Sequence, residues 1–416
     1  MASRNVHPSR ARFTRFKTKQ PFEFGLPNVA AAISQKSDGS VSYLTRVSSL
    51  LRQQVLPRAA SVKIVSDDIH LDVLPKEHWS QSFERKRVLF LIPADALGDC
   101  VGMTMFLRAF QAAYPQCKIG LLNTGRASDI FAELQNVEIF QLFISANMLK
   151  RFDVRIDLSE MAGWKDIAIA PVDCEGVLCQ EFDISPIPLP QKTTQTGKTL
   201  QIGILPLASS PLRTLPPEFV SKSIKVLQQK TGKTGHISVV LNAYQGVKEA
   251  YKAALGPMTA SDNIQLIDGF KTIAELVTFI GRCDYVLVAD SGPAHITKLF
   301  GISGVGVYTS ASADVLHGRF QNIKAWQSSF SGDYCAAPCG LAKMHATENG
   351  QIGCMGSLRV TRDKLVNLPN RRDPELVEKT SITDPVPCVR HLCTDFNRFG
   401  AFLGDDFKAR SLPARL

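Results

Sequence analysis

The stretch VLVADSGPAH, residues 286–295, changes abruptly from apolar residues to small and polar ones. A continuous apolar run of this kind is typical of a strand that is buried on both faces of a parallel sheet, and Pro293 suits the first position of a helix. The strand is therefore expected to end in a turn at Asp290. The helix that follows points its unpaired N–H groups at that turn, which is a favourable place for an anion.

Residues in and after this turn are the first candidates for an anion-binding site. A serine hydroxyl, a glycine amide and an imidazole are all groups that contact phosphate oxygens at a helix N-terminus. The structural alternative is that Asp290 caps the helix and that His295 packs against the sheet. Because special residue types fill five of six consecutive positions, the binding interpretation is favoured. The candidate residues are Asp290, Ser291, Gly292 and His295.

A second strand–turn–helix unit lies at residues 88–111, where an apolar run is followed by Asp95, Gly98 and Asp99. In a doubly wound sheet the ligand sits outside the carboxyl ends of the strands, so this turn is expected on the binding side. We expect the helix to begin near Cys100, which makes Asp99 either its N-cap or a general base. Because Gly98 frees the backbone beside it, Asp99 is a better candidate for the base than Asp95.

The loop LPLASSPLRTLPPEF, residues 205–219, combines serines with Arg213 and ends in prolines that suit the start of a helix. It follows another apolar run, so we expect it at the same edge of a sheet as the turn at Asp290. The forked guanidinium of Arg213 is suited to phosphate oxygens. A solvated loop arginine is the alternative.

Apolar runs of strand length alternate with helical segments after the first 85 residues, which predicts an α/β fold with parallel sheets. A proline-rich stretch at residues 184–199 interrupts this pattern and marks a domain boundary. We expect an N-terminal extension over residues 1–85, Rossmann-like doubly wound domains over 86–195 and 196–365, and a tail over 366–416 that packs across the first domain. The expected strands are residues 87–92, 118–123, 137–143, 152–158 and 166–172, then 200–207, 236–242, 263–269, 284–290 and 304–309.

The composition is that of a soluble globular protein, because 44% of the 416 residues are hydrophobic and 21% are charged. The formal net charge is +10, and no acidic residue precedes Glu23 in a strongly basic N-terminus. We expect a partly disordered basic arm there, with peripheral contact to an anionic inner-membrane surface as its alternative role. Residues 47–56 suit a short helix, and residues 61–74 alternate as a half-buried strand does. No apolar stretch reaches the length of about 18 residues that spans a bilayer, so we expect a cytoplasmic protein.

The ten cysteines fit a reducing compartment, because most of them stand singly within apolar runs. The exceptions are two spaced pairs, Cys335 with Cys339 and Cys388 with Cys393, and Cys354 between them. A structural Zn site requires four ligands in close pairs, and chance spacing is the alternative. Cys335, Cys339, Cys354 and Cys388 are therefore candidate ligands of a structural Zn or Fe ion.

These segments together resemble a known family. ADALGDCVGMTMFLRAFQAAYP, residues 94–115, is similar to the N-terminal motif of glycosyltransferase family 9, the bacterial heptosyltransferases. VLVADSGPAHITKLFG, residues 286–301, is similar to the donor motif of the same family, and YCAAPC with the later GCM resembles the cysteine-bearing segment that follows it. The resemblance implies a GT-B fold, in which two Rossmann-like domains face a central cleft.

The resemblance also implies a reaction and roles for the candidate residues. It implies an inverting, metal-independent transferase that moves a heptose-like sugar from a nucleotide diphosphate donor, ADP-heptose above all, to a lipopolysaccharide-core or related glycan acceptor. The acceptor binds mainly to the first domain, where Asp99 is the catalytic base and Asp95 and Gly98 belong to the acceptor-side turn. No cofactor is required for catalysis, and no nucleic-acid partner is expected. The implied donor-binding residues are Arg213, Asp290, Ser291, Gly292 and His295.

Other functions stay open from the sequence. One branch of the family glycosylates autotransporter proteins and also has an N-terminal extension and a cysteine metal site, so a protein or lipid-linked acceptor is an alternative. Two features depart from the family pattern: Pro93 replaces the usual polar or basic residue, and the acid that often contacts the donor ribose has no clear equivalent near residues 242–249. They leave a non-catalytic sugar-nucleotide-binding or assembly protein as another alternative. A dehydrogenase or epimerase is disfavoured, because no G-x-G-x-x-G motif follows the first strand.

Overall fold

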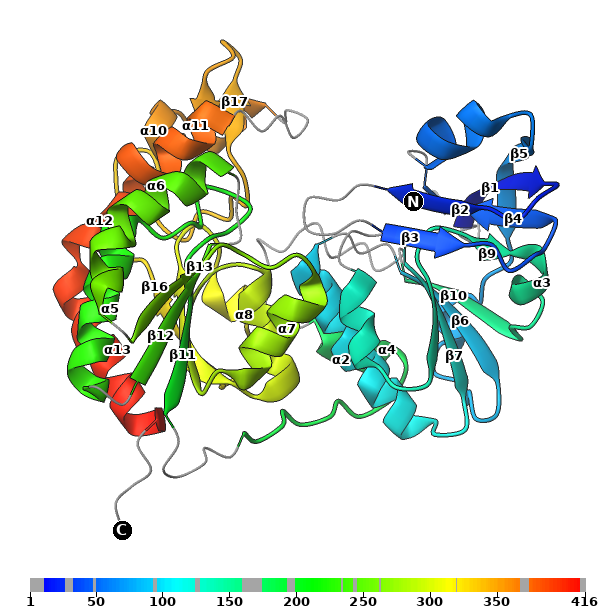
Figure 1. Cartoon of the computed structure of the whole chain (residues 1–416), viewed down its shortest axis with the longest axis horizontal. Helices are drawn as coiled ribbons and strands as arrows, with labels where there is room; N and C mark the ends of the chain where they lie inside the picture. Colours follow the sequence, from blue (N-terminus) through cyan, green and yellow to red (C-terminus); the bar gives the residue numbers. More distant parts are fainter. Residues whose placement is uncertain are drawn as a thin grey trace, which may run out of the picture. The chain divides into compact units, whose positions relative to one another are not determined.

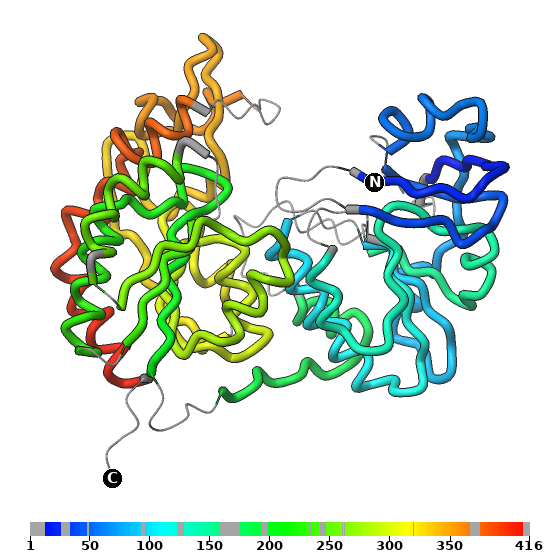
Figure 2. Tube along the Cα trace, in the orientation of Figure 1, coloured from blue at the N-terminus to red at the C-terminus, as the bar shows by residue number. Residues whose placement is uncertain are grey.

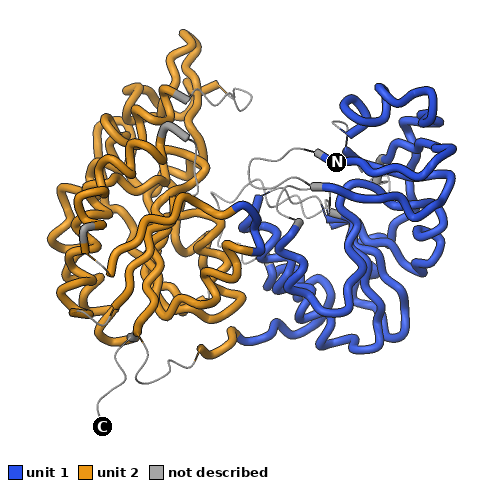
Figure 3. The backbone as a smooth tube through the Cα atoms, in the orientation of Figure 1, with its two compact units in different colours: residues 1–165, 174–188, 271–274 blue, residues 166–173, 189–270, 275–416 orange. Residues whose placement is uncertain are grey.

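The described chain divides into two units, which Figure 3 colours separately. The first unit comprises the described residues within 1–165, 174–188 and 271–274, and the second comprises those within 189–270 and 275–416. The predicted strand at 166–172 and the candidate Asp95 lie outside the described residues. The computed structural model (Figure 2) describes residues 11–26, 33–47, 50–92, 96–123, 128–158, 174–192, 199–232, 235–241, 245–261, 263–318, 320–366 and 374–411.

A parallel sheet forms the centre of the first unit. Its described strands pair in the order β10-β6-β7-β8, and they coincide with the apolar runs that predicted them. Every residue from Val88 to Ile92 is at most 2% exposed, because β6 is a central strand that is covered on both faces. The strands are β6 (Arg87–Ile92), β7 (Lys118–Asn123), β8 (Val137–Phe140) and β10 (Val154–Asp157).

The two faces of β6 pack against different layers. Phe90 contacts Phe106 of α2 (Leu97–Ala113) and Phe182, which directly follows α4 (Cys174–Glu181). Leu89 points to the opposite face, as the period of two in a strand requires, and shares a core with Phe13 and Leu44 of the N-terminal extension. The extension is therefore a structural layer of the first unit.

The extension forms an antiparallel sheet with the strand order β5-β1-β4-β9 among the described residues. The expectation of a disordered basic arm is wrong for residues 11–18, because Phe13 and Phe16 bury this segment as a strand. Residues 1–10 lie outside the described part. The predicted helix at 47–56 reduces to a π-helical turn (Leu51–Val55) and a 3-10 turn (Leu56–Arg58). The strands are β1 (Ala11–Thr18), β4 (Ser42–Thr45), β5 (Val62–Leu71) and β9 (Ile144–Ser145), with β2 (Glu23–Leu26) and β3 (Ile33–Lys36) paired separately.

The second unit has a larger parallel sheet, with the described strands in the order β13-β12-β11-β14-β15-β16. α5 (Pro217–Thr231) and α6 (Gln245–Leu255) cover one face, and α7 (Ile273–Arg282) and α8 (Gly292–Phe300) cover the other (Figure 1). The strand order reverses between β11 and β14, which makes their carboxyl ends the topological switch point. Both sheets confirm the predicted α/β class with Rossmann-like units. The strands are β11 (Leu200–Leu205), β12 (Gly235–Val240), β13 (Ile264–Ile267), β14 (Tyr285–Ala289), β15 (Ser303–Tyr308) and β16 (Ile323–Gln327).

The C-terminal segment packs on the second unit, so the expectation that it crosses the first domain is wrong. α13 (Phe396–Ser411) lies against α5 (Figure 1) and also contacts β15, and Phe399, Leu403 and Phe407 join the core of the sheet. Their spacing of four residues makes an apolar stripe along one helix face.

None of the described helices is both long and apolar enough to cross a membrane. The remaining elements include α3 (Ala146–Leu149), α9 (Ala313–Leu316), β17 (His345–Thr347), β18 (Ile352–Gly353), α10 (Met355–Leu358), β19 (Leu365–Val366), α11 (Pro374–Glu378) and α12 (Pro387–Thr394).

A buried polar cluster fixes α13 to the sheet. The Asp406 carboxylate accepts hydrogen bonds from the Tyr285 hydroxyl at 2.7 Å and from Arg410 Nε at 2.8 Å. Arg410 also donates to the carbonyls of Gln321 and Asn322 at 2.9 and 3.0 Å. A single carboxylate thus satisfies both a buried hydroxyl and a guanidinium.

Replacing Asp406 with alanine removes the acceptor of two hydrogen bonds and leaves the buried Tyr285 hydroxyl unpaired. We expect the free energy of unfolding to fall by about 3 kcal/mol, measured by urea unfolding. Asp405→Ala, at the exposed neighbouring position of α13, is the control and should change stability by about 0.5 kcal/mol or less. Equal losses in the two variants would contradict the assigned role of Asp406.

Candidate functional site

The candidate residues of the second unit lie at the switch point of its sheet. β14 ends at Ala289 and α8 begins at Gly292, where the sequence predicted them. The loop that carries Arg213 follows β11, the neighbour of β14 in the sheet. Ligands of doubly wound sheets bind at this edge.

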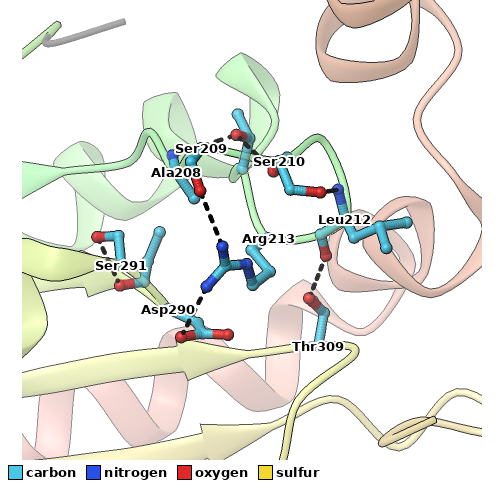
Figure 4. A network of polar contacts seen from close by, with 10 residues as sticks. Ala208, Ser209, Ser210, Leu212, Arg213, Asp290, Ser291 and Thr309 are labelled. Carbon is cyan, nitrogen blue, oxygen red and sulfur yellow. Dashed lines mark hydrogen bonds and ion pairs between the residues drawn. The ribbon is translucent and has the colours of Figure 1, made fainter. Parts of the chain in front are cut away.

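Arg213 is held between its own loop and the loop after β14 (Figure 4). Its Nη2 atom donates to Ser209 Oγ at 3.0 Å, and its Nη1 atom lies 3.5 Å from Asp290 Oδ1. The Arg213 side chain is 18% exposed, whereas that of Asp290 is 2% exposed. The guanidinium is therefore fixed in position while part of it still reaches solvent.

Asp290 contacts Arg213 and does not cap the helix. The N-cap of α8 is Ser291, so the capping alternative for Asp290 is wrong. Burial raises the pKa of the Asp290 carboxyl above its usual value, and the Arg213 charge opposes this shift. Asp290 Oδ2 and Arg213 Nε are buried without a hydrogen-bond partner. Such atoms are rare in folded proteins, and a ligand or a water molecule commonly satisfies them.

The N-terminus of α8 is not capped by a side chain. The Ser291 hydroxyl, which could have capped it, instead donates to the carbonyl of Ala289 at 3.2 Å. Pro293 has no N–H group, so it adds no unsatisfied donor to the first turn. The positive end of the helix dipole therefore stands beside Arg213, and both favour an anion at this place.

His295 lies in the first turn of α8 and is half-buried. Burial, reinforced by the nearby Lys298, His317 and Arg213, keeps the pKa of His295 well below its usual value. The imidazole is therefore neutral at neutral pH. It can exchange hydrogen bonds with a ligand, but it adds no positive charge.

Lys298 and His317 are neighbours of this site that sequence reasoning did not single out. Lys298 lies three residues after His295, a spacing that places both on one side of a helix and was readable from the sequence. His317 follows α9, and its ring centroid lies 6.5 Å from that of His295. Burial lowers the pKa of His317 to about 3. No signal in the sequence connects His317 with α8.

In the first unit, Asp99 lies in the first turn of α2. The helix begins at Leu97 with Ala96 as its N-cap, so the expected start near Cys100 and the capping alternative for Asp99 are both wrong. Asp99 is half-buried, and Gly98 precedes it in the same turn. An acidic residue in this position is stabilised as a carboxylate by the helix dipole.

The four candidate metal ligands, Cys335, Cys339, Cys354 and Cys388, line one cavity of about 10 Å³. This volume is close to the space that one water molecule needs. Cys393 packs elsewhere, beside the core of the sheet. As the described side chains are placed, no group of three or more His, Cys, Asp or Glu residues is arranged to hold a metal ion. Four thiols around one cavity are a donor set that suits Zn or Fe, and the metal itself stays a prediction.

No protein-family model matches the sequence, and no curated protein matches it. Several solved structures are similar to the chain. The E. coli ADP-heptose LPS heptosyltransferase II is 15% identical, with a TM-score of 0.44 over 59% of this chain and 92% of that chain. The glycosyl transferase family 9 protein of Veillonella parvula is 13% identical, with a TM-score of 0.44 over 60% and 87%. The iron-containing dodecameric glycosyltransferase TibC from enterotoxigenic E. coli is 11% identical, with a TM-score of 0.38 over 86% and 85%. Because these TM-scores are below 0.5, function has to be inferred from the residues of this chain.

Proposed function

We propose that this chain is an inverting glycosyltransferase that transfers a heptose-like sugar from a nucleotide diphosphate donor to a lipopolysaccharide-core or related glycan acceptor. ADP-heptose is the favoured donor. The observation that carries the proposal is the position of Arg213, held at the switch point of the second sheet beside the uncapped N-terminus of α8. The sequence motifs around Asp99 and Asp290, which resemble those of family 9, support the same reaction.

In the proposed reaction, the second unit holds the donor and stabilises its leaving group. Negative charge grows on the diphosphate as its bond to the sugar breaks. Arg213 and the N-terminus of α8 neutralise that charge, a role that a metal ion fulfils in other phosphate sites. One preorganised hydrogen-bond donor of this kind typically lowers the activation barrier of the chemical step by about 2.7–4 kcal/mol. His295 contributes as a neutral hydrogen-bonding group.

The first unit supplies the base in this proposal. The acceptor hydroxyl attacks the anomeric carbon, its proton passes to the Asp99 carboxylate, and the electron pair of the broken bond leaves with the diphosphate. An aspartate is a weak base for a sugar hydroxyl, so the proton moves late, when the transition state already resembles an oxocarbenium ion. Attack from the side opposite to the leaving group inverts the anomeric configuration.

A thermal-shift screen of nucleoside diphosphates and sugar nucleotides tests the proposal. A ligand at 100 times its Kd stabilises the folded protein by about 2.7 kcal/mol, and we expect ADP and ADP-heptose to raise Tm more than UDP or GDP. Lys252→Ala, a change at a partly exposed helix position of the same unit that the proposal does not assign to the donor site, is the control and should keep the ADP shift. If no nucleoside diphosphate raises Tm, the proposed function is wrong. If ADP-heptose binds but is neither hydrolysed nor transferred, the chain is a non-catalytic sugar-nucleotide-binding protein.

A second candidate function is protein O-glycosylation of the autotransporter heptosyltransferase type. The observation that favours it is the convergence of the four cysteines, since that branch of the family carries a cysteine metal site and an N-terminal extension. In this proposal Cys335, Cys339, Cys354 and Cys388 hold a structural Zn or Fe ion. Elemental analysis of the purified protein measures the metal, and parallel assays with a lipopolysaccharide-core acceptor and with an unglycosylated autotransporter passenger distinguish the acceptors.

A further inference from the structure

The cysteine cavity and the candidate donor site share one loop. Leu212 is 1% exposed and packs in one apolar core with Cys354 and Cys388. It also lines the same small cavity as all four cysteines, which we call the cysteine cluster (Cys335, Cys339, Cys354 and Cys388). The next residue along the chain is Arg213, whose side chain contacts Asp290 instead (Figure 4). Two neighbouring side chains therefore anchor the loop to two different sites.

Hydrogen bonds hold the backbone between these two side chains. The N–H of Leu212 donates to Ser210 Oγ at 3.3 Å, and the N–H of Arg213 donates to the carbonyl of Ser210 at 3.1 Å. The carbonyl of Leu212 accepts a hydrogen bond from Thr309 Oγ1, directly after β15. A displacement of Leu212 is therefore transmitted to Arg213, because little conformational freedom remains between them.

The segments that carry the cysteines are bound to the same edge of the sheet. The N–H of Gly340, the residue after Cys339, donates to the carbonyl of Ser310 at 2.7 Å. Ser328 Oγ, just after β16, donates to the carbonyl of Cys388 at 3.3 Å. Two segments distant in sequence thus hold the cysteine cluster against the loops that follow β15 and β16.

We propose that Leu212 is a positioning residue through which the cysteine cluster holds Arg213 in place for the donor diphosphate. Packing around Leu212 is tight, because the cavity beside it has room for only about one water molecule. Loosening the cluster frees Leu212, moves the guanidinium of Arg213 and weakens diphosphate binding. The role assigned to Arg213 rests on the proposed function, whereas the coupling between the cluster and the loop does not.

Two measurements on the full chain test this proposal. Hydrogen exchange of peptides covering residues 206–216 reports the order of the loop without any ligand. Calorimetric titration with ADP reports diphosphate binding. We expect Leu212→Ala and Cys388→Ala to speed exchange in this loop and to weaken ADP binding by roughly 10- to 100-fold. Leu212→Met nearly conserves the volume of the side chain, so its loop exchange and its ADP affinity should stay close to those of the unchanged protein.

Two matched variants separate positioning from a general loss of stability. Cys393→Ala changes a cysteine of α12, the helix that also carries Cys388, but Cys393 lies outside the cavity. Leu227→Ala truncates a buried leucine of α5. Both should leave loop exchange and ADP affinity unchanged below their melting temperatures. The proposal is overturned if Leu212→Ala and Cys388→Ala behave like these controls. If loop exchange rises but the unchanged protein binds no nucleoside diphosphate, the coupling stands and the proposed function fails.

Discussion

Replacing Asp99 with asparagine is expected to lower kcat for sugar transfer by about 10³-fold and to leave the Kd for ADP unchanged. The amide keeps the size of the side chain but cannot accept the proton of the acceptor hydroxyl. The proposed donor residues all belong to the second unit, so ADP binding does not depend on this carboxylate. Steady-state transfer assays and titration with ADP measure the two quantities.

Loss of structure is a poor explanation for such a result, because an acidic residue in the first helical turn contributes only about 0.3–1 kcal/mol. A thermal melt of Asp99→Asn checks this directly. Retention of most of the activity would remove Asp99 from the role of base. Asp95→Asn then becomes the decisive variant, since Asp95 is the other acidic residue of the family-9-like motif around Gly98 in the sequence.

The Rossmann-like sheets were predictable because their strands are buried on both faces. RVLFLI at residues 87–92 reads as one apolar run, and the structure makes all of it strand β6. The bounds of α8 were predictable for a different reason: a small-residue turn and Pro293 leave one place where the helix can begin. Such signals are local, so a single segment carries them completely.

The N-terminal sheet was not predictable in the same way. Strand β1 has register shifts between Phe13 and Arg15 and between Arg15 and Phe16, so its buried residues do not follow a period of two. Strand β9, which pairs with β4 at the edge of this sheet, has only two residues, Ile144 and Ser145, and comes from far along the chain. The alternation at residues 61–74 did predict β5, but strand β1 and the pairing of β4 with β9 were not visible in the sequence.

In the candidate site, too, local features were predictable from the sequence and contacts between distant segments were not. Residue types at the turn after β14 indicated an anion site, but only the fold brings Asp290 to Arg213 and makes the carboxylate a partner of the guanidinium. The spacing of the cysteines was irregular in sequence, and the fold gathers Cys335 and Cys388 around one cavity. Contacts between distant loops follow from sheet order, which propensity and spacing do not determine.

Arg213→Ala is expected to abolish most of the donor binding, with a loss of about 3 kcal/mol, or roughly 100-fold in the Kd for ADP. The guanidinium is held by Ser209 and Asp290 before any ligand arrives, so its binding geometry carries little entropic cost. Arg213→Lys keeps the charge but loses the forked geometry, and an intermediate affinity is expected. Titration with ADP at constant salt measures both variants.

The same substitution should also make stability depend on pH. Burial already raises the pKa of Asp290, and Arg213 opposes that shift, so removing the arginine raises the pKa further. The folded variant then binds a proton more tightly than the unfolded chain does. At pH values below about 4, the pKa of the carboxyl in the unfolded chain, the variant keeps its full stability. Its stability falls as the pH rises through the higher pKa of the carboxyl in the folded state. The lowered pKa values of the buried His295 and His317 act in the opposite direction in both proteins. The expected result is therefore a difference: between pH 5 and pH 8, Arg213→Ala loses stability relative to the unchanged protein, measured by urea unfolding at each pH.

A double variant separates the two effects. Arg213→Ala with Asp290→Asn removes the buried carboxylate together with its cation, so the extra pH dependence should disappear and stability should recover. Breaking a buried ion pair on one side costs about 3–5 kcal/mol because a charge is left uncompensated, and this cost is absent when both charges are removed. Donor binding should stay lost, since the guanidinium is still missing. Recovery of ADP binding in the double variant would mean that Arg213 acts only as the counter-ion of Asp290 and not as a ligand of the diphosphate.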